Sequence, residues 1–169
     1  MKKLIAIDPG NEMSGLAILD ANTYTPLYEG KHANQEIMRM FATAEIDIKD
    51  ARIVIEELAH YGTGMPAGKT VFDTAKWIGR YIQFFVERGF TVELLPRTTV
   101  KTRLCGTPRA KDGNVIQSLV DRFAPNTPNK GKGVKKTPGY FYGFSADMWQ
   151  AYALGVVYLD IKKGKNGGF

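Results

Sequence analysis

The sequence predicts an α/β domain in which a mixed five-stranded sheet carries helices on both faces. Near the N-terminus, three apolar segments joined by short connections predict an antiparallel meander. Further along, β-branched segments alternate with amphipathic helical segments, which adds strands to the same sheet and helices around it. The length of 169 residues, with 44% hydrophobic and 24% charged residues, suits one globular domain spanning residues 1–169.

The N-terminal half is expected to contain the meander, one helix and a fourth strand. The stretch "LIAIDPGNEMSGLAIL" has two apolar runs around an Asp-Pro-Gly turn. Later, the β-branched run "ARIVIEEL" ends in two glutamates. The expected elements are strands at 3–8, 15–19 and 25–29, a helix at 34–44 and a strand within 51–58.

The C-terminal half is expected to be mainly helical. A Gly-rich segment, "HYGTGMPAG", precedes a helix whose apolar residues recur at helical spacing: Val71, Phe72, Ala75, Ile78, Ile82 and Phe85. On the same helix Trp77 and Tyr81 lie four residues apart, facing either a second subunit or the domain core. The expected elements are helices at 69–88, 97–104, 111–123 and 145–161, and a strand at 91–95.

The positive charge of the chain is concentrated in one segment. The net charge of +6 favours a polyanionic partner, although only weakly by itself. The stretch "NKGKGVKK" lies in a predicted surface loop at about 124–143, just before the last helix, so its lysines are expected near any site there. They either contact phosphates or form a solvated face, and they are Lys130, Lys132, Lys135 and Lys136. Residues 162–169 are expected to be a flexible basic tail.

The sequence indicates a cytoplasmic protein that does not enter a membrane. No apolar run approaches the roughly 20 residues of a membrane-spanning helix. The run after the N-terminal lysines is interrupted at Asp8, so no export signal is expected. The single cysteine, Cys105, excludes an intrachain disulfide and fits a reducing compartment.

Acidic side chains lie where an α/β sheet usually places its functional site. Asp8 and Glu56 each end an apolar strand, and Asp147 begins the last helix. If the first and fourth strands are neighbours, the first two carboxylates converge. Each acid also has a structural interpretation: Asp8 as a turn residue, and Asp147 as a favourable charge at a helix N-terminus. Glu57 should point to the opposite face of its strand.

Three convergent acids predict a divalent metal centre. Like charges raise one another's pKa, so a cluster of ionised carboxylates needs cations. Mg²⁺ is a hard ion that takes carboxylate oxygens and keeps waters, and Mn²⁺ is a plausible substitute. Two such ions about 4 Å apart activate water and stabilise the leaving oxygen in phosphodiester hydrolysis.

Four segments together resemble the RuvC-type Holliday-junction resolvases, a branch of the ribonuclease H-like nucleases. In chain order they are "IAIDPGNEMSGLAIL", "IVIEEL", "TTVKTRLCGTPRAKDGNVIQSLV" and "SADMWQAYALGV". The resemblance covers nearly the whole chain and implies a ribonuclease H-like fold. It also implies a homodimeric, Mg²⁺-dependent endonuclease that cuts branched DNA, and the small stand-alone size is similar to phage-borne versions.

The resemblance also implies roles for individual residues. Asp8, Glu56 and Asp147 match the metal ligands, while Lys101 and Lys111 match lysines that hold the DNA backbone. The family's last helix usually carries a second acid three residues after the first. Here that position is Gln150, a carboxamide that is a candidate ligand without charge.

Two further expectations concern an acid that could replace the missing charge at position 150 and an aromatic residue in the Gly-rich segment. Glu57 or Asp73 is a candidate to supply the charge that Gln150 lacks. Tyr61, in the Gly-rich segment, is the candidate aromatic wedge that enters the junction.

Cleavage of four-way junctions, and of three-way junctions and flaps, is the leading functional hypothesis. One alternative is a branched-DNA-binding protein on the same fold with weakened catalysis, which Gln150 keeps open. Another is an RNA-processing ribonuclease H-like nuclease. The Asp-Pro-Gly segment also resembles the phosphate loop of actin-like sugar kinases, but those need a second related domain and a second such motif.

Overall fold

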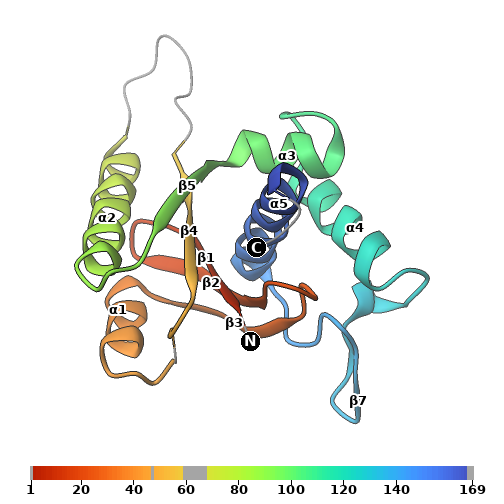
Figure 1. Ribbon diagram of the computed structural model, residues 1–169. Coiled ribbons are helices and arrows are strands. Elements are labelled where there is room, and N and C mark those ends of the chain that lie inside the picture. The colour runs from red at the N-terminus through yellow and green to blue at the C-terminus, as the bar shows by residue number, and fades with distance from the viewer. Residues whose placement is uncertain (1, 47, 59–67, 167–169) are drawn as a thin grey trace.

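The structure, a computed structural model, describes residues 2–46, 48–58 and 68–166 of the chain (Figure 1). Its strands are β1 (Lys3–Asp8), β2 (Met13–Asp20), β3 (Pro26–Ala33), β4 (Arg52–Glu57) and β5 (Val92–Pro96). They form a five-stranded sheet in the order β3-β2-β1-β4-β5. The β1–β2 and β2–β3 pairs are antiparallel, whereas β1–β4 and β4–β5 are parallel, which confirms the predicted mixed sheet.

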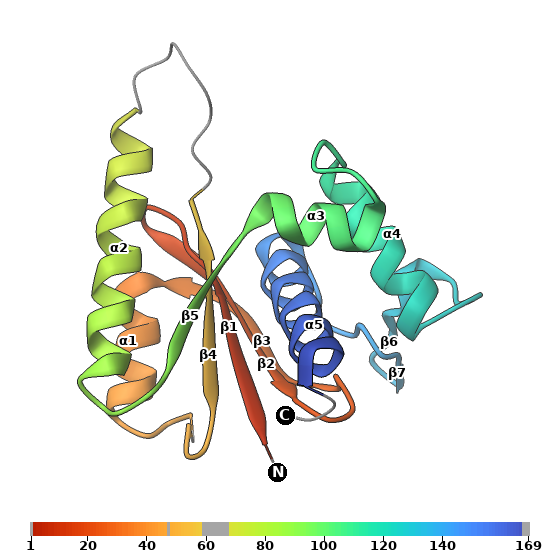
Figure 2. The same ribbon diagram turned by 45° about the horizontal axis from the view of Figure 1, so that its top comes forward.

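Helices cover both faces of the sheet, as the sequence predicts. Figure 2 shows α1 and α2 on one side of the strands, and α3, α4 and α5 on the other. The helices are α1 (Asn34–Ala42), α2 (Lys69–Val86), α3 (Arg97–Cys105), α4 (Asp112–Phe123) and α5 (Ala146–Asn166).

The strand alternation divides the interior into two cores. In β1, Leu4 and Ala6 join the core beneath α5, whereas Ile5 and Ile7 join the core beneath α1 and α2. All four side chains are fully buried. Because β1 is apolar on both faces, its acidic side chain, Asp8, lies where the strand ends.

The α2 helix departs from its predicted apolar face. Thr74, Ile78 and Tyr81 are buried, but Val71 and Phe72 at its start are exposed. Figure 2 shows the start of α2 extending beyond the ends of β4 and β5, so these two residues have no sheet to cover. Tyr81 is fully buried in the domain core, so of the two alternatives it faces the core and not a second subunit.

The α5 helix is the central element of its layer. From Ala151 to Leu159 every residue except Gly155 is a buried apolar or aromatic side chain, and the helix packs on β1 and β2. It continues to Asn166, so residues 162–166, expected in a flexible tail, are helical. Lys162 pairs with Glu93 at 2.6 Å, which attaches this end of the helix to β5.

The segment expected as a long loop contains local structure. It includes a 3₁₀ turn, η1 (Asn129–Gly131), and a small hairpin of β6 (Gly133–Val134) and β7 (Thr137–Pro138). Phe141 is fully buried against Trp149 of α5, with ring centroids 4.6 Å apart. Phe141 and Phe144 after the hairpin therefore serve as core packing, whereas Tyr142 is exposed.

In the described part of the chain, no helix combines the length and the apolar character that crossing a bilayer requires.

Candidate active site

The candidate functional side chains lie in one row across the sheet. Asp8 of β1 is paired with Gly15 of β2, and Gly15 is paired with Lys31 of β3. On the other side, the parallel register of β1 and β4 places Ile7 opposite Ile55, so Asp8 and Glu56 end neighbouring strands. By alternation the row faces α5, because Ala6 and Val54 two residues earlier belong to that core.

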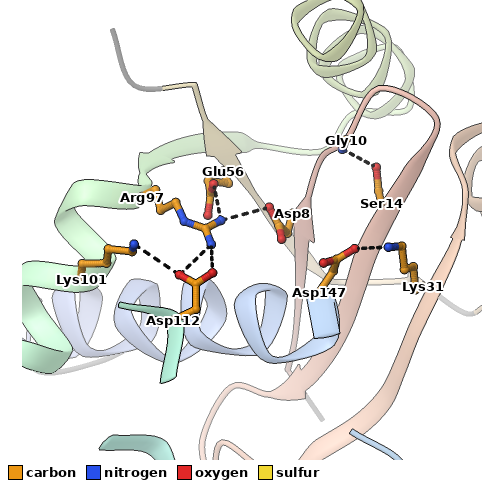
Figure 3. Close-up of polar contacts among 9 residues, drawn as sticks. All are labelled: Asp8, Gly10, Ser14, Lys31, Glu56, Arg97, Lys101, Asp112 and Asp147. Atoms are coloured by element: carbon orange, nitrogen blue, oxygen red, sulfur yellow. Dashed lines mark hydrogen bonds and ion pairs between the residues drawn. The ribbon is translucent and has the colours of Figure 1, made fainter. Parts of the chain in front are cut away.

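A glycine in this row brings α5 onto the strand ends. A Cβ atom at Gly15 would lie 2.5 Å from the carbonyl oxygen of Asp147 and 3.0 Å from its carbonyl carbon. The missing side chain therefore lets the first turn of α5 rest directly on β2, next to Asp8. The Asp147 carboxylate points toward the sheet, where Lys31 Nζ lies 2.6 Å from its Oδ2 (Figure 3).

We expect Gly15→Ala to displace Asp147 from the row. The clash is with backbone atoms, so α5 must move rather than rotate a side chain. Overpacking of this kind costs about 1–3 kcal/mol of stability, and a displacement of about 1 Å at a catalytic group costs about 10²-fold in rate. Thermal unfolding and the proposed cleavage assay measure the two effects. Gly79→Ala is the matched control, because no atom lies within 4 Å of its added Cβ.

Arg97 connects the acids on the other side of the row. It begins α3 directly after β5, and its Nη1 lies 3.2 Å from Glu56 Oε1 and 3.9 Å from Asp8 Oδ1. Its Nη2 donates hydrogen bonds to both oxygens of Asp112, at 3.1 and 3.2 Å. Lys101, one turn further along α3, lies 3.3 Å from Asp112 (Figure 3).

Burial and mutual repulsion perturb the two central acids. Burial, together with the charge of Glu56, raises the pKa of Asp8 to about 8, although Arg97 acts in the opposite direction. Burial also raises the pKa of Glu56, and again Arg97 opposes the shift. Two desolvated carboxylates at adjacent strand ends are therefore incompletely neutralised by one guanidinium. This is the electrostatic condition of a site that attracts a further cation.

The carboxylates of Asp8, Glu56 and Asp147 are suitable ligands for a hard divalent ion, although they do not surround one common position in this structure. Among the described residues, no three acidic, histidine or cysteine side chains converge at the distance of one metal ion. Instead Arg97 holds Glu56 near Asp8, and Lys31 holds Asp147. All three acids offer oxygen ligands from one face of the sheet, which is the chemistry that Mg²⁺ prefers. Asp8, Glu56 and Asp147 are the residues that would hold it.

Several residues proposed from sequence lie away from this row. Glu57 is exposed, and alternation turns it to the other face of the sheet, as predicted. Asp73 pairs with Lys69 and Lys76 on α2, which covers that other face, so it does not supply charge to the site. Gln150, by contrast, is buried in α5 one turn after Asp147, on the same side of the helix, and it stays a candidate uncharged ligand.

The predicted DNA-binding lysines fall into separate places. Lys101 lies at the site, whereas Lys111 is an exposed residue just before α4. Both views of the fold place the β6–β7 hairpin near the end of α4 that lies far from the acids (Figures 1 and 2), and η1 packs against Ala124 at that same end. The fold therefore does not bring the lysines of this segment to the site. Those lysines are Lys130, Lys132, Lys135 and Lys136. Tyr61 lies outside the described residues.

Sequence reasoning missed three residues of the site. Arg97 follows a parallel strand, the same signal that selected Asp8 and Glu56. Lys31 required the register of β3, which continues to Ala33 rather than ending near residue 29. Asp112 has the usual appearance of an acid in the first turn of a helix, and no sequence signal separates it from a helix-dipole residue.

A buried polar network fixes the turn after Asp8. Ser14 Oγ accepts a hydrogen bond from Gly10 N at 3.3 Å and donates to Asn34 Oδ1 at 2.6 Å. Asn34 Nδ2 donates to the carbonyl of Gly10 at 2.9 Å, and the Tyr81 hydroxyl donates to Asn34 Oδ1 at 3.2 Å. The turn is thereby tied to α1 and α2, which fixes the end of β1 beside the site.

Comparison with known proteins shows the fold. No protein-family model and no curated protein matches the chain. The chain is similar to RuvC of Thermus thermophilus, with a TM-score of 0.62 at 15% identity over 96% of both chains. It is also similar to T. thermophilus RuvC in complex with a Holliday junction substrate, with a TM-score of 0.63 at 13% identity over 96% of both chains. The chain therefore has the ribonuclease H-like fold of RuvC, as the sequence resemblance implies.

Proposed function

We propose that this protein is a metal-dependent endonuclease that cuts branched DNA, with four-way junctions as its main substrate. The observation that carries the proposal is the row of Asp8, Glu56 and Asp147 at the carboxyl edge of a RuvC-like sheet. Support for the substrate comes from the Holliday junction substrate of the T. thermophilus RuvC complex. Three-way junctions and flaps are further substrates to test.

The residues of the row have distinct roles in this proposal. When bound, Mg²⁺ ions supply an activated water and stabilise the leaving oxygen of the phosphodiester. Asp8, which lies between Glu56 on one side and Asp147 on the other, holds the centre of the site. Lys101, largely buried beside Asp112, places a positive charge where the scissile phosphate approaches.

A cleavage assay on matched substrates tests the proposal. Purified protein is incubated with a labelled four-way junction, a linear duplex of the same arms and an RNA–DNA hybrid, with Mg²⁺, Mn²⁺ or EDTA. We expect paired symmetric nicks in the junction, only with metal, and no cutting of the duplex. A junction band retarded on a native gel without nicks would instead identify a binding protein. Preferential cutting of the hybrid would identify an RNA-processing nuclease.

We expect the hairpin lysines to contribute affinity rather than catalysis. Lys135 and Lys136 are exposed and Lys132 is partly exposed, and the hairpin lies away from the acids, so these lysines reach an arm of the DNA and not the cleaved phosphate. Replacing Lys132, Lys135 and Lys136 with glutamine should weaken junction binding and reduce the salt slope by about 0.9 per lost phosphate contact. Cleavage at saturating protein should be unchanged. Equal salt slopes for the variant and the wild type would contradict this role.

A homodimer is part of the proposal, because a symmetric junction needs two active sites related by a two-fold axis. The exposed Val71 and Phe72, on the part of α2 that extends past the sheet, are an apolar surface for a second copy. Sedimentation of the wild type and of Phe72→Asp would test whether this surface forms the dimer.

A further inference from the structure

We infer that Arg97 is a built-in counter-ion of the carboxylate site, and that it must leave the site when a divalent metal binds. The inference rests on the proposed function, because it concerns how the metal centre of that function is assembled. It gives Arg97 a role in positioning the acids and controlling metal affinity, separate from the chemical step.

The guanidinium occupies the space that the acids share. Nη1 lies between Glu56 Oε1, at 3.2 Å, and Asp8 Oδ1, at 3.9 Å. Nη2 is held from the other side by both oxygens of Asp112. Figure 3 shows the Arg97 side chain inserted among these three carboxylates, from the first turn of α3.

A metal ion and this guanidinium exclude each other. Mg²⁺ lies about 2.1 Å from its ligand oxygens, closer than the 3.2 and 3.9 Å at which Nη1 lies from Glu56 Oε1 and Asp8 Oδ1. An ion held by both acids would therefore replace the contacts that Nη1 makes with them. The two cations would also repel each other strongly at such a separation, because the surrounding side chains are largely buried. Metal binding is therefore an exchange in which Glu56 and Asp8 replace one cation with another.

Asp112 gives the displaced side chain a defined destination. It begins α4, is about half exposed, and binds Arg97 through two hydrogen bonds and Lys101 through an ion pair. When Nη1 leaves the strand ends, Nη2 can stay on Asp112 while the guanidinium turns outward. Arg97 then remains beside the site, next to Lys101, where a DNA phosphate would approach.

Calorimetric titration with Mn²⁺ at pH 8 tests the exchange without any nuclease assay. We expect Arg97→Gln to bind Mn²⁺ at least about tenfold more tightly than the wild type, since a competing charge is removed from the site. Arg97→Lys keeps the charge but cannot contact Glu56 and Asp112 at the same time through two nitrogens, so its Mn²⁺ affinity should lie between those of the wild type and Arg97→Gln. Arg103→Gln is the matched control: it removes an equal charge from an exposed position of α3 and should bind as the wild type does.

The outcomes separate this inference from the proposed function. Equal Mn²⁺ affinity in the wild type and in both Arg97 variants would overturn the counter-ion role and leave the metal centre standing. Weaker binding by Arg97→Gln, if the protein stays folded by circular dichroism, would also overturn it, because Arg97 would then support the metal. No Mn²⁺ binding by any of the four proteins would contradict the metal centre and the inference together.

Discussion

Asp8→Asn is expected to abolish cleavage of a four-way junction while leaving junction binding intact. Asp8 lies between the other two acids, at the end of β1, and its side chain is only 13% exposed. The substitution keeps the size of the side chain and removes the charge that would bind metal. Loss of a central ligand should reduce the cleavage rate by at least about 10³-fold, measured as single-turnover nicking in Mg²⁺.

Two acids outside the row are the controls for this experiment. Glu57→Gln changes the neighbour of Glu56 on the opposite face of β4, and Asp73→Asn changes an acid on α2. Both variants should cut at close to the wild-type rate. If Asp8→Asn retained full activity, the assignment of the site would be wrong. Loss of activity in Asp73→Asn instead would locate the site on the other face of the sheet.

Asp8→Asn is also expected to stabilise the metal-free protein at pH 8. The pKa of Asp8 is raised in the folded state from 3.8 to about 8 by burial and by Glu56, so the fold retains a proton that the unfolded chain releases. Stability is therefore unaffected by this group below about pH 4, decreases as the pH rises toward 8, and is constant above. At about 1.4 kcal/mol per pKa unit, the wild type should lose on the order of a few kcal/mol over that interval.

Chemical denaturation in EDTA between pH 5 and pH 8 measures this effect. The difference between Asp8→Asn and the wild type reports the Asp8 contribution together with the relief of its repulsion on Glu56, because the other titrating groups are shared. The variant should gain stability relative to the wild type as the pH rises, and Mg²⁺ should restore the wild type at pH 8. Asp121→Asn, an exposed acid on α4, should show no such change. Parallel pH profiles for Asp8→Asn and the wild type would show that Asp8 carries no buried charge penalty.

The strands and their polar ends could be predicted from sequence because the relevant signals are local. The apolar runs that end in Asp8 and Glu56 reveal both the strand and the side of the sheet where its acid lies. Strand alternation likewise predicts that Glu57 faces away. The order of strands and helices along the chain, together with the pairing of the first and fourth strands, then restricts the sheet to few possible strand orders.

The rest of the site depends on contacts between distant segments. Gly15 looks like an ordinary strand residue until α5 is placed on it, and only then does Asp147 join Asp8. The lysine-rich segment precedes α5 in sequence, yet the hairpin extends near the far end of α4. Val71 and Phe72 have correct helical spacing but lie beyond the sheet that would cover them. The spacing of apolar residues predicts which face of α2 is apolar, but it does not reveal how far the sheet beneath that face extends.

The central claim is that Asp8, Glu56 and Asp147 together form a divalent metal centre. Its most direct test is an anomalous difference map from crystals grown with saturating Mn²⁺. The account predicts a peak within coordination distance of Asp8 and Glu56, with Asp147 turned from Lys31 toward the metal and Arg97 withdrawn from the strand ends. A map without such a peak, in which Arg97 still bridges Glu56 and Asp112, would contradict it.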